Sequence, residues 1–293
     1  MDQYDGYSSR STSANWEYIP REKSQRASEI LSETQLGNVD SESQLEPLQR
    51  LTWDDIKLPL ILFVATCAST YYVQGLAFSI AMMTILLCHE FGHYFLSRRY
   101  RVKASLPYCI PMPASPLGTM GAVIAMRSQI PNRKALFDIG IAGPLAGLLP
   151  ALVCTVVGLS LSVPTAGAAH SIVLGKPLIF LWIRSWFFTP TAAEPFFALH
   201  PLAVAGWGGI FITALNLIPI GQLDGGHILY AMLRRWSYPI TTLLLYGALA
   251  AMVFTGNYGW IIMVVLLMMY GPIHPPTQHD NEPLGWEERS LAG

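Results

Sequence analysis

The sequence predicts an all-α polytopic membrane protein with about six transmembrane helices and a small membrane-associated β-region after the second helix. Three observations carry this prediction. The 293-residue chain is 52% hydrophobic and only 13% charged, and its mean hydropathy is +0.38. A soluble domain of ordinary composition is about 25% charged. The apolar residues also come in long blocks, which is typical of helices that span a bilayer.

Charge and cysteine content exclude some other classes of site. The formal net charge of −1 gives no indication of a nucleic-acid partner. All four cysteines lie in or beside apolar stretches, and no two of them have metal-ligand spacing. We therefore expect buried thiols, not disulfides or a cysteine metal site. These cysteines are Cys67, Cys88, Cys109 and Cys154.

Composition divides the chain into three regions. Residues 1–52 are rich in Ser, Glu and Gln and contain few apolar residues, so we expect a disordered cytoplasmic tail. Residues 53–273 hold the apolar blocks and form the predicted transmembrane core. Residues 274–293 are predicted to be a cytoplasmic C-terminal tail.

The first apolar stretch is too long for one span at 1.5 Å per residue. We expect it to split near Gln74 and Gly75 into a hairpin of two helices, roughly 56–73 and 76–98. Four further blocks give the remaining spans. The segment Lys176–Phe188 is apolar but contains Arg184 and is flanked by prolines, so an interfacial helix with its tryptophans at headgroup depth is expected there. The four further blocks are Leu136–Val163, about 202–220, Ile240–Phe254 and Tyr258–Gly271.

Lysines and arginines gather at one set of predicted helix ends. They follow the second predicted helix (76–98), precede the third, and lie between the fourth and the fifth. These helix ends share one side if the six predicted helices alternate across the membrane. That side is expected to be the cytoplasm and to hold both termini, with Lys176 and Arg184 as exceptions. The layout of a short tail and a core suits a bacterial inner membrane. The residues concerned are Arg98, Arg99, Arg101, Lys103, Arg127, Arg133, Lys134, Arg234 and Arg235.

Ionisable residues interrupt the second predicted helix, roughly 76–98. Within "TILLCHEFGHYFLSRR", His89, Glu90 and His93 form the pattern H-E-x-x-H. Two histidines at i and i+4 lie on one helix face and can bind one zinc ion, and the adjacent glutamate can accept a proton from a metal-bound water. Charged groups inside a membrane are costly, which favours a functional role. A chance match, or helix-end residues that face polar neighbours, is the alternative.

A third ligand is available in "ALNLIPIGQLDGGHILYAMLRR". Pro219 should break the helix there, and a broken helix at membrane depth is tolerated where it lines a cavity. Asp224 can then turn into that cavity, and Asn216 carries amide donors upstream. The alternative is an ordinary Asp-Gly-Gly turn. His227 is a rival ligand, although capping or orienting the loop is its more expected role.

The two motifs "HEFGH" and "NLIPIGQLDGG" together resemble the site-2 protease family of intramembrane zinc metalloproteases. The resemblance covers roughly residues 55–285, and Ser115–Gly147 is similar to bacterial and chloroplast members. It implies one zinc ion per chain bound by His89, His93 and Asp224, with Glu90 as catalytic base. It also implies that Asn216 binds substrate or stabilises the oxyanion. From the length of the predicted loops we expect no PDZ domain, and we expect no CBS-like extension after the last span.

The resemblance also bears on the segment after the basic cluster. "TMGAVIAMR" has strand-like content and is expected to form a short membrane-associated hairpin near the site, where an exposed strand edge can pair with an extended substrate. A plain cytoplasmic loop is the alternative. The small residues of "GIAGPLAG" suit tight helix packing and are assigned a structural role.

The sequence thus predicts an intramembrane zinc metalloendopeptidase that hydrolyses peptide bonds in or near transmembrane segments of other membrane proteins. Its expected partners are a membrane-protein substrate with a transmembrane helix and the lipid bilayer. A non-hydrolytic transporter or metal-binding membrane protein with a broken helix is the second hypothesis. A protease-like scaffold that binds helices without cutting is the third, and the intact Glu90 argues against it.

Overall fold

The computed structural model describes residues 52–165, 177–188, 196–256, 261–270 and 275–280. The chain divides into two compact units, Met1–Gln49 and Arg50–Gly293, and all described residues belong to the second. The predicted disordered tail therefore lies outside the described residues except for Thr52, and only 275–280 of the predicted C-terminal tail is described. The three-region division stays a prediction.

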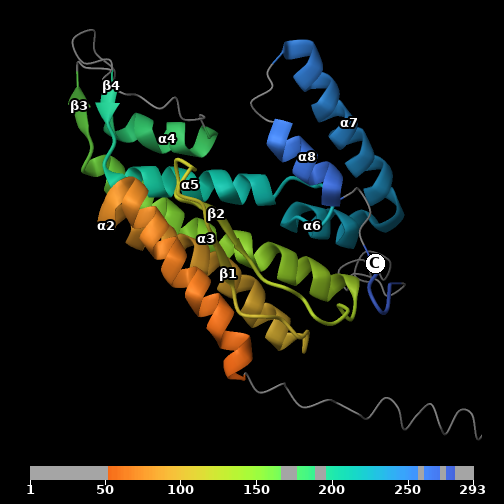
Figure 1. The fold of residues 1–293 in the computed structure, drawn as a ribbon. Helices are drawn as coiled ribbons and strands as arrows, with labels where there is room; N and C mark the ends of the chain where they lie inside the picture. Colours follow the sequence, from red (N-terminus) through yellow and green to blue (C-terminus); the bar gives the residue numbers. More distant parts are fainter. Residues whose placement is uncertain (1–51, 166–176, 189–195, 257–260, 271–274, 281–293) are drawn as a thin grey trace, which may run out of the picture. The chain divides into compact units, whose positions relative to one another are not determined.

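The first helical element is a hairpin. Helix α2 runs from Trp53 to Arg99, but Gly75 breaks it with φ 82° and ψ −178° (Figure 1). The side-chain oxygens of Thr70 and Ser79 lie 2.8 Å apart. In one continuous helix, nine residues would separate them by about 13 Å. The chain therefore folds back at Gly75, and the predicted split near Gln74 and Gly75 is confirmed.

The core forms where the second half of α2 packs against α3 (Arg133–Ser160) and α5 (Pro201–Asn216). Phe78, Met82 and Ile85 of α2 are almost completely buried in it. Small residues bring α3 and α5 into close approach, since a Cβ added to Gly158 would lie 2.0 Å from the backbone nitrogen of Ala203. Such contacts are typical of helices that associate within a bilayer.

A small antiparallel sheet lies against α2, as the sequence predicts. Strand β1 (Tyr108–Pro111) pairs with β2 (Thr119–Val123), with a register irregularity between Cys109 and Pro111. Ser69 donates a hydrogen bond to the carbonyl of Gly118 at 2.6 Å. That contact is only a few residues from the turn at Gly75, so the hairpin of strands extends far along α2, away from Arg99 (Figure 1). All four cysteines are free, but only Cys109 is buried and the other three are half-buried.

Helix α4 (Leu178–Phe187) occupies the segment predicted to be interfacial. Phe180 and Ile183 are buried in the core, whereas Leu178, Trp182 and Trp186 recur at four-residue spacing on the exposed side. This apolar exposed stripe with paired tryptophans suits headgroup depth. A second two-stranded sheet, β3 (Val163–Thr165) with β4 (Phe196–Ala198), was not expected from the sequence.

The remaining helical elements among the described residues are α6 (Asp224–Leu233), a 3₁₀ turn (Arg234–Trp236), α7 (Ser237–Thr255) and α8 (Ile261–Tyr270). Three stretches of the described residues are long and apolar enough to cross a membrane: Trp53–Arg99, Arg133–Ser160 and Asp224–Thr255. Arg234, at φ 45°, interrupts the last of these. The protein is thus mostly helical, with membrane-spanning character and small two-stranded sheets. The fourth predicted block, about 202–220, ends as a helix at Asn216.

The turn at Gly75 leads to a stability prediction. No atom would contact a Cβ at Gly75, so the cost of Gly75→Ala arises from the backbone conformation alone, about 1–3 kcal/mol. Gly247→Ala is the matched control, because Gly247 lies inside α7 and also has open space around it. We expect thermal unfolding in detergent to show a lower melting temperature than wild type for Gly75→Ala and no decrease for Gly247→Ala. Equal melting temperatures for the two variants would contradict the assigned turn.

Candidate metal centre

His89, Glu90 and His93 lie near the C-terminal end of α2, and their exposed fractions are only 4%, 4% and 5%. The helix continues through all three residues, so the two histidines project from one face, one turn apart. Their imidazole rings lie with centroids 5.0 Å apart. The predicted arrangement of two histidines on one helix face is therefore present, and it is buried.

Asp224 reaches the histidines because the chain turns sharply between α5 and α6. Helix α5 ends at Asn216, Pro219 cannot continue it, and Gly221 adopts φ 57°. Asp224 is the first residue of α6, so the alternative of an ordinary Asp-Gly-Gly turn was wrong. A Cβ on Gly225 would lie 2.1 Å from the carbonyl oxygen of Leu217. Glycine is required there because the connecting segment packs on the first turn of α6.

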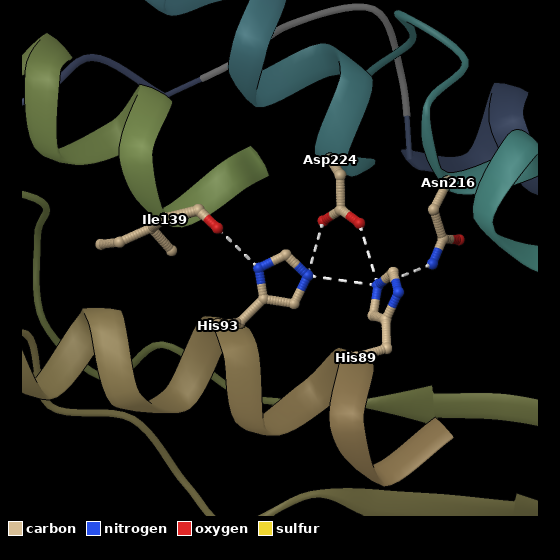
Figure 2. Close-up of polar contacts among 5 residues, drawn as sticks. All are labelled: His89, His93, Ile139, Asn216 and Asp224. Atoms are coloured by element: carbon tan, nitrogen blue, oxygen red, sulfur yellow. Dashed lines mark hydrogen bonds and ion pairs between the residues drawn. The ribbon is translucent and has the colours of Figure 1, made fainter. Parts of the chain in front are cut away.

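Figure 2 shows the three side chains converging from two helices. His89 Nε2 lies 3.1 Å from Asp224 Oδ2, and His93 Nε2 lies 3.2 Å from Asp224 Oδ1. The two Nε2 atoms are 3.2 Å apart. A tetrahedral zinc ion with bonds of about 2.0–2.1 Å holds its ligand atoms roughly 3.3 Å apart. The two Nε2 atoms and the Asp224 carboxylate therefore have the spacing and the chemistry of a zinc site with three protein ligands.

A hydrogen bond to the backbone of α3 fixes the orientation of the His93 ring. Its Nδ1 lies 2.7 Å from the backbone oxygen of Ile139 on α3 (Figure 2). A carbonyl only accepts, so Nδ1 carries the proton and donates it, which leaves the Nε2 lone pair directed at the metal position. A buried hydrogen bond of this kind is the usual support of a metal-binding histidine.

The small residues of α3 pack directly on the two imidazoles. A Cβ on Gly143 would lie 2.0 Å from His93 Nε2, and one on Gly147 would lie 2.9 Å from the Cβ of His89. Gly140, Gly143 and Gly147 share one face of α3 by helical spacing. The structural role predicted for "GIAGPLAG" is confirmed. The sequence did not reveal that these glycines pack against His93 and His89. The spacing of these glycines was the available signal.

Glu90, Asn216 and His227 line the same cavity of about 150 Å³ as the three clustered residues. Asn216 Nδ2 lies 3.2 Å from His89 Nε2, which brings the amide next to the proposed ligands (Figure 2). Among the described residues, the group with metal-ligand geometry is His89, His93 and Asp224, without His227. His227 lies in the first turns of α6, so the loop that it was expected to cap is a helix.

In comparison with known proteins, residues 77–255 match peptidase family M50. The chain belongs to this family. The matched range includes both the H-E-x-x-H motif and Asp224, and it confirms the resemblance to site-2 proteases predicted from the sequence.

Several relatives have curated names. The chain is 35% identical over 183 residues to a probable zinc metalloprotease EGY1, chloroplastic, of Oryza sativa subsp. japonica, covering 59% of this chain and 31% of the relative. It is 30% identical over 225 residues to the Arabidopsis thaliana protein of that name, covering 75% and 41%. The chain thus spans less than half the length of these relatives.

A solved structure, the site-2 protease from Methanocaldococcus jannaschii, is also similar, with 20% identity and a TM-score of 0.37. The similarity covers 73% of this chain and 84% of that chain.

The contact between Gly143 and His93 leads to a metal-binding prediction. We expect Gly143→Ala to displace the His93 ring and to lower the zinc content of the purified protein several-fold. Gly140→Ala is the matched control, because a Cβ there would meet its nearest atom at 3.2 Å, from His227. Zinc per chain is measured by mass spectrometry, with thermal unfolding to verify folding. Full zinc content in a folded Gly143→Ala protein would refute the role of this contact.

Proposed function

We propose that this chain is an intramembrane zinc metalloendopeptidase that hydrolyses peptide bonds in or near transmembrane segments of other membrane proteins. The observation that carries the proposal is the buried triangle of His89, His93 and Asp224 with Glu90 in the same cavity. Membership of peptidase family M50 supports hydrolysis of a peptide. The names of the rice and Arabidopsis relatives support zinc as the metal.

Each polar residue of the site has a proposed role in this reaction. Zinc, when bound, supplies the Lewis acidity that activates a water molecule and polarises a carbonyl. His89, His93 and Asp224 hold the ion, and the hydrogen bond to Ile139 keeps His93 in the required tautomer. Glu90 accepts the proton of the attacking water and later donates it to the leaving amine. Asn216 donates a hydrogen bond to the carbonyl oxygen of the scissile peptide.

The β-region is the proposed site for the substrate backbone. Ala122, Val123 and Ile124, at the end of β2, line the metal cavity together with Glu90. Residue Ala122 pairs with Cys109 of β1 on one side. An extended substrate segment can pair along such a strand, which is how many proteins present a peptide bond to a catalytic group.

We further propose six membrane-spanning helices: the two halves of α2, α3, α5, α7 and α8. The basic residues at alternating ends support a cytoplasmic location for both termini and for the metal-proximal end of α2. The bacterial inner membrane stays a prediction from the sequence. The relatives are named chloroplastic, so a chloroplast membrane is the competing location.

A transporter or metal-binding membrane protein is the second candidate, because the break between α5 and α6 resembles the discontinuous helices of transporters. The position of Glu90 favours hydrolysis. A carboxylate that shares the metal cavity without belonging to the ligand triangle suits a proton acceptor.

Replacement of Glu90 separates metal binding from chemistry. Glu90→Gln preserves the size of the side chain but removes the base, so we expect zinc to be retained and cleavage of a model transmembrane substrate to fall roughly 10²- to 10⁴-fold. Zinc content and the cleavage rate are measured on the same preparation. Cleavage at the wild-type rate would exclude the proteolytic mechanism and favour the transporter.

Replacement of Asp224 tests the third ligand. We expect Asp224→Ala to lose zinc and activity together, since two histidines alone hold zinc much more weakly. The control is Asp138→Ala, which removes a carboxylate of α3 that bonds to Lys134 and Tyr100 and should leave zinc content unchanged. If Asp224→Ala retained one zinc per chain, His227 would become the next candidate ligand.

The topology is tested with single cysteines in a background without the native four. Gln129 precedes α3 and Val163 follows it, and both are exposed. We expect Gln129→Cys and Trp236→Cys to react with an impermeant thiol reagent from the cytoplasmic face only, and Val163→Cys from the opposite face only. Labelling of positions 129 and 163 from one face would mean that α3 does not span, and the six-helix arrangement would be withdrawn.

A further inference from the structure

Residues 275–280 lie against the segment that leads into α3. The backbone N–H of Gln278 donates to the carbonyl of Ile130 at 3.0 Å, and that of His279 donates to Pro131 at 2.8 Å. His279 and Asn132 form a parallel β-bridge. The segment therefore binds its neighbour as an added strand does, through main-chain hydrogen bonds between chain portions far apart in sequence.

A cluster of polar side chains fastens the end of this segment. Asp280 Oδ2 accepts a hydrogen bond from Arg234 Nε at 2.6 Å, while Oδ1 accepts from Tyr230 at 3.2 Å and from Thr277 at 3.0 Å. Burial opposes ionisation of Asp280, but these hydrogen bonds outweigh it and hold the pKa of the carboxyl below its usual value. Tyr230 lies in the last turn of α6, the helix that begins with Asp224, and Arg234 directly follows that helix.

The same segment forms one wall of a second cavity, of about 620 Å³. Pro275, Pro276 and Thr277 line it together with the 124–130 segment. Ile124, Met126, Gln222 and His227 line both this cavity and the metal cavity, so the two adjoin. We refer to the larger cavity as the vestibule of the metal site, and residues 275–277 form part of its lining.

We propose that residues 275–280 are a strap that controls access of an extended polypeptide to the metal cavity, with Asp280 and Arg234 as its clasp. The proposal rests on the proteolytic function above. The strap pairs with residues 130–132, which follow in the chain the end of β2 where we propose that a substrate strand pairs. Its attachments are a few hydrogen bonds and an ion pair whose arginine side chain is 44% exposed, and contacts of this kind break individually at little cost. The strap can therefore release without disturbing the metal ligands.

The clasp is tested with Asp280→Asn, and Asp54→Asn is the matched control. Asp54 forms an ion pair of equal length, 2.6 Å, with Lys57 at the exposed start of α2. We expect Asp280→Asn to speed backbone hydrogen exchange in 275–280 at least several-fold and to raise kcat/KM for a model transmembrane substrate, with zinc content unchanged. Asp54→Asn should change none of these. Wild-type exchange and kcat/KM in Asp280→Asn would overturn the proposal.

A reversible disulfide that holds the strap in place tests the proposal directly. Asn132→Cys and His279→Cys, in a background without native cysteines, place two thiols at the bridged positions, within the reach of a disulfide. We expect the oxidised protein to cleave the substrate several-fold more slowly than the same protein after reduction. Since both forms carry the same substitutions, loss of the Asn132 cap on α3 affects them equally.

Two results are distinguishable in this experiment. Equal cleavage by the oxidised and reduced forms, with the disulfide verified, would overturn the strap but leave the proteolytic function intact. Absence of cleavage by the zinc-loaded wild-type protein would refute the proteolytic function and, with it, the strap.

Discussion

The meeting of Asp224 with His89 and His93 is the interaction on which the rest of this structure depends. Three ionisable side chains lie within an apolar helical core, where an unpaired charge is strongly destabilising. They are tolerated because each has a partner: the carboxylate bridges both imidazoles, and His93 also donates to Ile139. A cation at their centre would satisfy all three donor atoms at once, which explains why a membrane-embedded core retains them.

Close backbone approach is the constraint that makes this meeting possible. The imidazoles need space on the face of α3, and Gly143 and Gly147 leave it. The first turn of α6 needs to lie against the segment that follows α5, and Gly225 and Gly226 permit that contact. At each point a methyl group would overlap backbone or imidazole atoms. The glycines of two distant motifs therefore perform one task, which is to bring α2, α3 and α6 within reach of a single ion.

Access to the buried site depends on the non-helical parts of the chain. The end of β2 lines the metal cavity, and the segment after it lines the adjoining vestibule. Residues 275–280 bond to Ile130 and Pro131, just before α3, and to Tyr230 and Arg234 at the end of α6 and just after it. The elements that carry Ile139 and Asp224 are thus tied together at the mouth of the vestibule. These attachments are made to residues other than the proposed ligands and Ile139, so the proposed strap can release while the ligand geometry is kept.

Local patterns in the sequence were sufficient to predict the helical class, the hairpin at Gly75, the strand in "TMGAVIAMR" and the ligand pair on one helix face. Each of these depends on periodicity, segment length or glycine conformation, which are properties of neighbouring residues. Asp224 was predicted by coupling its segment to an H-E-x-x-H motif that lacks a third ligand, and the family resemblance then implied the same residue, because its immediate surroundings alone do not distinguish a ligand from a turn residue.

Tertiary packing alone determined the rest. It made Asp224 the start of a helix and set Gly143 against His93. It also paired residues 275–280 with 130–132. The contacts of Gly143 with His93 and of residues 275–280 with 130–132 join residues 50 to about 150 positions apart, and their stability comes from the shape of facing surfaces, which no local pattern records.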